Sequence, residues 1–196
     1  DDIYSYEAPP VDGQIGNVCV FCSASIKDKN YIDEGYELGR KMADEGLGCV
    51  SGAGRTGIMG SVVNGAVEAN GWTGGSNVPH IIKLEGLPEG LSSFWLRPDI
   101  YTRMEIMIER SDAFVIFPGG AGTVQEFLAL LLLLEMGDPV MKGKPIVVYD
   151  RIDKSGKNFW KPLINLLKEK GYADYFTVVN ELGIVIPVSY THLTLP

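Results

Sequence analysis

The sequence predicts an α/β fold in which a doubly wound parallel sheet lies between two layers of helices. Three observations predict it. Short runs of β-branched and apolar residues alternate with segments of helical length, which is the pattern of βαβ units. The runs are almost continuously hydrophobic, as expected of strands that helices cover on both faces. The 196 residues contain neither an internal repeat nor a low-complexity linker, so we expect one domain.

The expected strands and helices alternate along the chain. The strands are residues 17–22, 48–50, 78–82, 113–117 and 145–149. The helices are residues 31–45, 58–70, 101–111, 124–136 and 159–170. Apolar residues recur within the helices at helical spacing, as Leu38 and Met42 do, and supply a stripe that faces the core. In such sheets a ligand binds beyond the carboxyl ends of the strands, near the point where the strand order reverses.

Both ends of the chain differ from its middle. Residues 1–16 contain Pro9, Pro10 and Gly13 and show no periodicity, which predicts an extended N-terminal arm. Residues 17–187 form the single domain, whose last segment is a strand-like run at 184–186. Residues 188–196, VSYTHLTLP, resemble a peptide translated from a cloning adapter, and we set them apart as a non-native tail.

The charge balance argues against some partners. Lys and Arg number 17 and Asp and Glu 25, which gives a net charge of −8. Because no basic run exceeds two residues, a surface for nucleic acid or for an anionic membrane is not expected. The longest apolar run, 127–134, is much shorter than the ~20 residues that cross a bilayer. We therefore expect a cytoplasmic protein that binds neither nucleic acid nor membranes.

The cysteines predict structural thiols rather than a metal site. Cys19, Cys22 and Cys49 fall in or beside strand-like runs, which fits buried, reduced thiols. A zinc site needs four ligands, and the chain has one Cys-x-x-Cys pair, no second cysteine pair and only two histidines, His80 and His192, so such a site is hard to complete. We expect no metal.

The predicted helix 124–136 is apolar on every side, because residues 127–134 read FLALLLLL. A helix that is apolar all round is buried all round. The sheet covers only one side of a helix in a three-layer domain, so the other side needs a cover. A second copy of the chain is the simplest cover, and we expect a homodimer through this helix. The alternative is a cover from elsewhere in the same chain.

The first of two glycine-rich loops follows the strand 48–50. It contains G-x-G-x-x-G at Gly52, Gly54 and Gly57 and leads into a helix, so its backbone N–H groups can approach a phosphate. A dinucleotide site also needs an acidic residue at the end of the next strand, and residues 74–78 contain none. The loop therefore favours a phosphate over NAD.

The second loop follows the strand 113–117 and leads into the helix 124–136. After a proline it consists of Gly119, Gly120, Ala121, Gly122 and Thr123. Backbone N–H groups of such small residues can converge on an anion, and the threonine hydroxyl can join them. No lysine follows in the order that a nucleoside triphosphate loop requires, so we expect one monophosphate. The two loops indicate a Rossmann-like nucleotide-binding domain.

Glu126 follows Thr123 at a spacing with two interpretations. Thr-x-x-Glu is a capping box, in which each side chain caps a backbone N–H at the start of a helix. Alternatively, Glu126 faces a ligand held by the loop, and the helix dipole and nearby N–H groups keep it ionised at neutral pH. An ionised carboxylate suits a nucleophile or a stabiliser of positive charge better than a proton donor.

At these residues the chain resembles the LOG family, whose members are nucleoside 5′-monophosphate phosphoribohydrolases often mislabelled lysine decarboxylases. The family motif P-G-G-x-G-T-x-x-E is present in full at residues 118–126. The similarity includes VFCSAS at 20–25, the loop 52–60, SDAF at 111–114 and KPIV at 144–147, and spans residues 17–167. It implies hydrolysis of the N-glycosidic bond of AMP or a cytokinin riboside monophosphate to free base and ribose 5-phosphate.

The resemblance also implies catalytic residues. The family pairs the motif's glutamate with the arginine of an M-H-x-R-K motif, and these residues correspond to Glu126 and Arg103. Ile100, Tyr101 and Met104 replace the Met, His and Lys of that motif. Met104, beside the arginine, is expected to contact the substrate.

Further substrate contacts are expected from Ser23 and from an upstream glutamate, which is Glu89 or, as the alternative, Glu85. Arg103 stays charged, so it can position a phosphate or ribose but cannot protonate the departing base. Tyr101 is the candidate for that acid.

Two other functions compete with the hydrolase. The same loops could serve a non-catalytic nucleotide-binding protein or a molybdenum-cofactor carrier of the same fold, but retention of Arg103 and Glu126 favours the enzyme. A decarboxylase would need pyridoxal phosphate, and Lys142 and Lys144 lie in a predicted loop without a paired acid or phosphate motif. We expect no cofactor.

Overall fold

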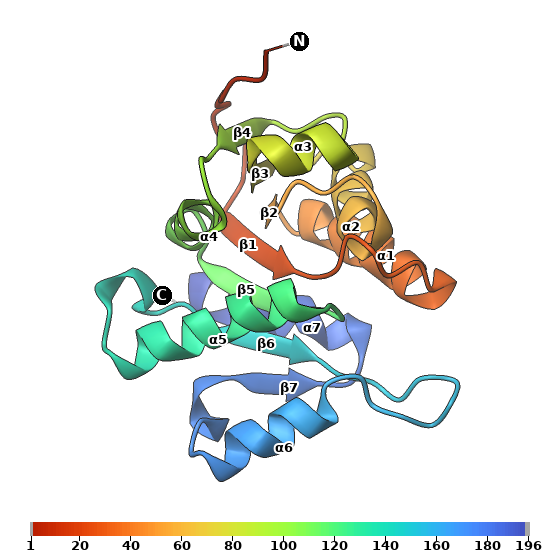
Figure 1. The fold of residues 1–196 in the computed structure, drawn as a ribbon, viewed down its shortest axis with the longest axis vertical. Coiled ribbons are helices and arrows are strands. Elements are labelled where there is room, and N and C mark those ends of the chain that lie inside the picture. Colours follow the sequence, from red (N-terminus) through yellow and green to blue (C-terminus); the bar gives the residue numbers. More distant parts are fainter. Residues whose placement is uncertain (1, 195–196) are drawn as a thin grey trace.

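A computed structural model describes residues 2–194 of the chain and the side chains of residues 2–190. In this part, a wholly parallel sheet has the strand order β4-β3-β2-β1-β5-β6-β7 (Figure 1). The strands are β1 (Gly16–Phe21), β2 (Leu47–Ser51), β3 (Thr73–Asn77), β4 (Ser93–Leu96), β5 (Ala113–Ile116), β6 (Ile146–Tyr149) and β7 (Thr177–Val179). The helices are α1 (Lys29–Asp44), α2 (Gly57–Glu68), α3 (Pro79–Glu85), α4 (Ile100–Glu109), α5 (Ala121–Glu135), α6 (Lys161–Glu169) and α7 (Leu182–Thr194).

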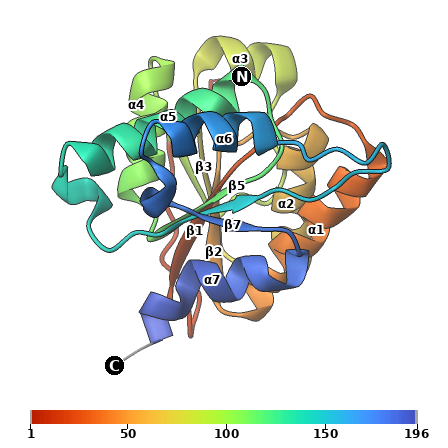
Figure 2. The ribbon, with the colours of Figure 1, turned by 90° about the horizontal axis from the view of Figure 1, so that it is seen from below.

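The helices form two layers on opposite faces of the sheet (Figure 2). On one face α1, α2 and α7 bury Leu38, Ile58 and Val185 completely. On the other face α4, α5 and α6 pack, with Met107 and Leu130 fully buried. The predicted three-layer, doubly wound Rossmann-like sheet is confirmed. Among the described residues, no helix has the length and apolar character needed to span a bilayer.

The strand predicted at 78–82 is wrong. A proline opens α3 in this region, and the strand β3 lies just before it. The sequence of β3, TGGSN, lacks an apolar run, yet all five residues are buried. The rings of Trp72 and Trp95 fill the space over Gly74, so this strand gains from neighbouring tryptophans the packing that its own side chains lack.

Strand β4, which the sequence analysis missed, forms one edge of the sheet and is covered by the N-terminal arm. Tyr6 and Phe94 form an antiparallel bridge with N···O distances of 2.9 and 2.8 Å. The indole N–H of Trp95 donates to the carboxylate of Glu7 at 2.7 Å. The arm expected at residues 1–16 thus shields an edge strand, and β1 begins at its last residue. The opposite edge, β7, was also missed, since it has three residues, two of them exposed.

The last element differs from the expectation. The strand-like run at 184–186 lies inside the helix α7, where Val185 and Ile186 are buried in the core. The Ser189 side chain is fully buried, and its hydroxyl donates to the carbonyl of Val185 at 2.6 Å. Residues 188–190 of the expected separate tail therefore pack with the domain. Residues 195–196 of that tail lie outside the described residues.

Candidate active site

A cleft of about 320 Å³ opens at the carboxyl edge of the sheet, where β1 lies beside β5 and the strand order reverses. Its walls come from the segments after β1, β2, β3 and β5 and from α4. It brings together these predicted residues: Ser23, Gly54, Arg103, Gly120, Ala121, Gly122, Thr123 and Glu126. The fold therefore gathers at one edge most of the chemistry that the sequence places in separate loops.

The second glycine loop forms one end of this cleft, at the N-terminus of α5. Gly120 is the N-cap of α5, and the helix begins at Ala121. The first N–H groups of a helix lack partners within the helix and lie at the positive end of its dipole, so they suit a phosphate. A Cβ on Gly119 would overlap the hydroxyl of Thr123, whereas open space surrounds Gly120 and Gly122. The loop is therefore packed on one side and open on the other.

The capping-box interpretation of Thr123 and Glu126 is wrong. Because α5 begins before the position predicted from sequence, Thr123 lies in its first turn and Glu126 in its second, which is too late for a cap. No side chain of the described residues caps this helix. Thr123 is buried, and Glu126 lines the cleft.

Glu126 ionises less readily than its position after a glycine loop predicts. Burial raises its pKa from 4.5 to about 7, and the positive charge of Arg103 opposes this only in part. Beyond the first turn, the carboxyl gains little from the helix dipole. A group that titrates near neutral pH can accept a proton and return it, as general acid–base catalysis requires.

Arg103 is fixed to the ends of two strands. Its Nε–H donates to the carbonyl of Ser76 in β3 at 2.8 Å, and its Nη2–H donates to the carbonyl of Gly52 after β2 at 2.5 Å. Burial lowers the pKa of the guanidinium, and the charges of Glu126 and Glu85 oppose this; an arginine remains protonated in either case. Arg103 therefore places a fixed positive charge beside Glu126.

The first glycine loop serves packing more than phosphate binding. Of its motif glycines only Gly54 lines the cleft, and its N–H donates to the sulfur of Met59 at 3.0 Å. A Cβ on Gly52 would overlap the bound guanidinium, and one on Gly57, where φ is +64°, would overlap the backbone of Ala24. Close packing thus accounts for two of the three glycines.

Ser23 shapes the loop after β1. Its Oγ accepts hydrogen bonds from the N–H groups of Ser25 and Ile26, both at 2.9 Å. These bonds turn the chain back over the cleft and keep the Ser23 side chain in its wall.

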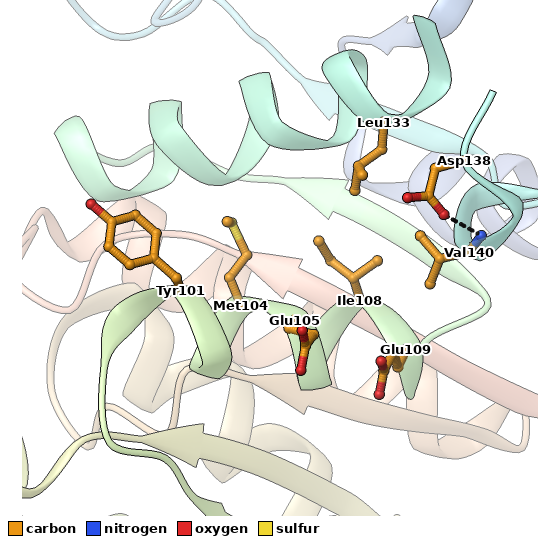
Figure 3. Close-up of a pocket in the computed structure, with 8 residues that line it drawn as sticks. All are labelled: Tyr101, Met104, Glu105, Ile108, Glu109, Leu133, Asp138 and Val140. Carbon is orange, nitrogen blue, oxygen red and sulfur yellow. Dashed lines mark hydrogen bonds between the residues drawn. The ribbon is translucent and has the colours of Figure 1, made fainter. Parts of the chain in front are cut away.

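Some predicted residues lie outside the cleft. Glu89 is exposed in the loop after α3, and Glu85, at the end of that helix, lines the cleft instead. Tyr101 and Met104 line a separate groove between α4 and α5, shown in Figure 3. Successive helical residues point about 100° apart, so Met104 cannot share the direction of Arg103. Tyr101 is correspondingly not placed to protonate a departing base.

Asn77, Ile81 and Ile100 also line the cleft, although none of them was predicted from the sequence as a site residue. Asn77 is the last residue of β3, and Ile81 lies on the helix that follows. Recognition of β3 would have placed a polar side chain at the carboxyl end of a strand, which is the signal for a ligand-facing position.

The cysteines have structural positions. Cys19 and Cys22 belong to hydrophobic cores on opposite faces of the sheet, so their spacing does not form a ligand pair. They and Cys49 are free and buried, and burial raises the pKa of each thiol. Within the described residues, no group of three or more His, Cys, Asp or Glu side chains is arranged to hold a metal ion.

The fold and the cleft define a Rossmann-like α/β protein with a glycine loop at a helix N-terminus and a half-buried acid at the switch point of its sheet. The chain belongs to the LOG family: the family model described as "Possible lysine decarboxylase" matches residues 59–188.

Curated relatives support this assignment. The chain is 31% identical over 133 residues to a cytokinin riboside 5′-monophosphate phosphoribohydrolase of Mycobacterium tuberculosis, which covers 68% of this chain and 70% of the relative. It is 27% identical over 175 residues to the protein of the same name from Rhodococcoides fascians, which covers 87% of this chain and 83% of the relative.

Solved structures share the fold. The molybdenum cofactor binding protein of Rippkaea orientalis aligns with a TM-score of 0.70 at 18% identity, over 91% of this chain and 98% of that one. The molybdenum cofactor carrier protein of Chlamydomonas reinhardtii aligns with a TM-score of 0.68 at 20% identity and the same coverage. At these identities the likeness concerns the fold alone.

The raised pKa of Glu126 predicts a pH-dependent cost in stability. The folded chain holds this proton more tightly than the unfolded chain, so the free energy of unfolding falls as pH rises between about 4.5 and about 7. Above that range the buried carboxylate costs up to about 3 kcal/mol. The Glu126→Gln variant should therefore be more stable than the wild type near pH 8 and close to it near pH 5, as measured by urea denaturation.

Glu169→Gln, a substitution at an exposed position of α6, is the matched control and should show no such pH-dependent difference. If the free energies of unfolding of the wild type and Glu126→Gln differ by the same amount at both pH values, this carboxyl titrates normally and the prediction is wrong.

Proposed function

We propose that the chain hydrolyses the N-glycosidic bond of a nucleoside 5′-monophosphate, of the AMP or cytokinin riboside monophosphate type, to free base and ribose 5-phosphate. One observation carries the proposal: a half-buried carboxyl with a pKa of about 7 lines the same cleft as a fixed arginine and the glycine loop that opens α5. The names of the curated relatives support the same reaction.

The proposed binding mode follows from the order of the cleft walls. The phosphate lies at the start of α5, against the open side of Gly120 and Gly122. The ribose then lies near Glu126 and Arg103, farther along the cleft. Binding of the unreactive phosphate contributes to the orientation of the reacting carbon, which favours monophosphates over nucleosides.

In the proposed reaction, the electrons of the C1′–N bond pass to the base, and the ribose gains oxocarbenium character. The Glu126 carboxylate stabilises this cation and takes a proton from the water whose oxygen bonds to C1′. The departing base nitrogen then takes up one proton, from Glu126 or from solvent. The near-neutral pKa of Glu126 makes both transfers accessible, which removes the need for Tyr101 as a separate acid.

A carrier function fits the cleft less well. A molybdenum cofactor or a tightly held nucleotide is an anion, and a site built only to bind it gains nothing from a carboxyl on the same helix as the anion loop. In a hydrolase, Glu126 meets a positive charge that develops only in the transition state, and this is the interaction that accelerates a reaction.

A decarboxylase fits still less well. The residues that line the cleft include no lysine able to form a Schiff base. Lys144 donates from Nζ to the carbonyl of Ile108 at 3.0 Å, far along α4 from Arg103, and Lys142 is exposed. The three free, buried cysteines fit action in a reducing compartment such as the cytoplasm.

Incubation with a panel of nucleoside 5′-monophosphates and the matching nucleosides tests the proposed reaction. Chromatography should detect free base and ribose 5-phosphate from monophosphates, and the Glu126→Gln variant should release base at least about 100-fold more slowly because it can neither take up the proton nor stabilise the cation. Glu169→Gln should match the wild type.

Undiminished release by Glu126→Gln would remove the carboxyl from the mechanism. If the wild type releases no base but binds a nucleotide tightly in calorimetry, the non-catalytic carrier becomes the better account.

We also propose that the chain is a homodimer through α5. Phe127, Leu130 and Leu131 of this helix are buried against the sheet, whereas Leu128 and Leu132 on its outer side remain 40% and 54% exposed. The described part of the chain therefore does not cover this side. Grooves flank α5 on both sides, one against α4 (Figure 3) and an apolar one against α6. A leucine ridge beside an apolar groove is self-complementary about a two-fold axis.

Light scattering at micromolar concentration should give twice the chain mass of 21.4 kDa for the wild type. Leu132→Glu should shift the mass toward the monomer because it buries a charge in the interface. Leu84→Glu is the control, since Leu84 is exposed on α3, away from this surface. A wild type that is monomeric under these conditions would contradict the dimer.

A further inference from the structure

Asn77 is a polar residue at the carboxyl end of β3 whose role the proposed mechanism does not use. Its side chain is buried, with 1% of its surface exposed, and it lines the cleft. Buried carboxamides are uncommon and are normally hydrogen-bonded through both the oxygen and the nitrogen. The partners of Asn77 therefore indicate whether it is structural or faces a ligand.

The two ends of the Asn77 carboxamide differ. Its Oδ1 accepts a hydrogen bond from the N–H of Val78 at 2.9 Å, which fixes the orientation of the amide. Its Nδ2 has no hydrogen-bond partner among the described residues. An unpaired buried donor destabilises the fold, so a structural asparagine would leave the fold less stable than an apolar residue of its size.

The polar groups next to Asn77 already have partners. The hydroxyl of Ser76 donates to the carbonyl of Trp95 at 2.7 Å, and the carbonyl of Ser76 accepts from Arg103. The carbonyl of Asn77 itself accepts from the N–H of Arg97 at 3.0 Å. The Nδ2 of Asn77 is thus an unpaired side-chain donor at this strand end that remains for a ligand.

The position of Asn77 in the sheet indicates which part of a bound nucleotide it faces. Three strand spacings, roughly 14 Å, separate β3 from β5, whose loop holds the proposed phosphate site. Glu126 lies on α5, which follows β5, and Arg103 is bonded to carbonyls at the ends of β2 and β3. Near Asn77 the walls are Ile81 and Ile100, whose apolar side chains can flank a flat ring. This end therefore suits the base rather than the phosphate or the ribose.

We propose that Asn77 is a specificity-determining residue that donates a hydrogen bond from Nδ2 to an acceptor on the base, either a ring nitrogen or a carbonyl oxygen. The proposal rests on the proposed function, because it takes the substrate to be a nucleoside monophosphate. Asn77 selects bases that present a hydrogen-bond acceptor to this end of the cleft, and it disfavours bases that present a hydrogen atom there.

Analogues of AMP in which N1, N3 or N7 is replaced by CH test this contact. With the wild type, one of the three analogues should lose at least about tenfold in kcat/KM, because it leaves the buried Nδ2–H unpaired. The Asn77→Asp variant keeps the side-chain shape and the bond from the Val78 N–H but replaces the donor. In that variant AMP itself should lose at least about tenfold, and the difference between AMP and the critical analogue should disappear.

Asn64→Asp, at an exposed position of α2, introduces the same chemical change outside the cleft and should leave both values unchanged. Base release without discrimination among the three analogues would overturn the role of Asn77 and leave the proposed function standing. If the wild type releases no base, the Kd values of AMP and the three analogues are measured by calorimetry instead. Weaker binding of one analogue than of AMP supports the contact with Asn77. Equal Kd values for all four compounds, or no binding, overturn it. The wild-type measurements do not depend on whether Asn77→Asp folds.

Discussion

The candidate site depends on how Arg103 is held. Its guanidinium is bound to carbonyls at the ends of β2 and β3, so a charge carried on a helix takes its position from the sheet. Gly52 has to be a glycine because this guanidinium occupies the place of a Cβ. The fixed charge of Arg103 lowers the pKa of Glu126, but it offsets only part of the increase that burial causes. The strand ends and Gly52 thus fix the position of Arg103, and Arg103 in turn influences the ionisation of Glu126.

The fold could be predicted largely from sequence because apolar runs and amphipathic periods are local signals. Strands β1, β2, β5 and β6 carry such runs, and each lies close to its predicted position. The strand β3 escaped prediction because Trp72 and Trp95, not its own residues, fill the space beside it. The apolar run at 184–186 was misassigned because a short hydrophobic segment fits a buried helix as well as a strand.

The site could be predicted where a motif is contiguous. The loop from Gly119 to Thr123 and Glu126 follow from one motif, and the family resemblance adds Arg103. The raised pKa of Glu126 could not be predicted, because burial is set by elements distant in sequence. Asn77 was not predicted as a site residue because its strand, β3, was not predicted. The choice between Glu85 and Glu89 required knowledge of where α3 ends, since Glu85 at that end lines the cleft.

Carboxyl-carbon NMR titration of glutamate-labelled protein measures whether the fold holds one carboxyl of the cleft at a near-neutral pKa. We expect one glutamate signal to titrate near pH 7, well apart from the others, and to be absent from the Glu126→Gln variant. If every glutamate instead titrates near its ordinary pKa, the electrostatic account of this site is contradicted.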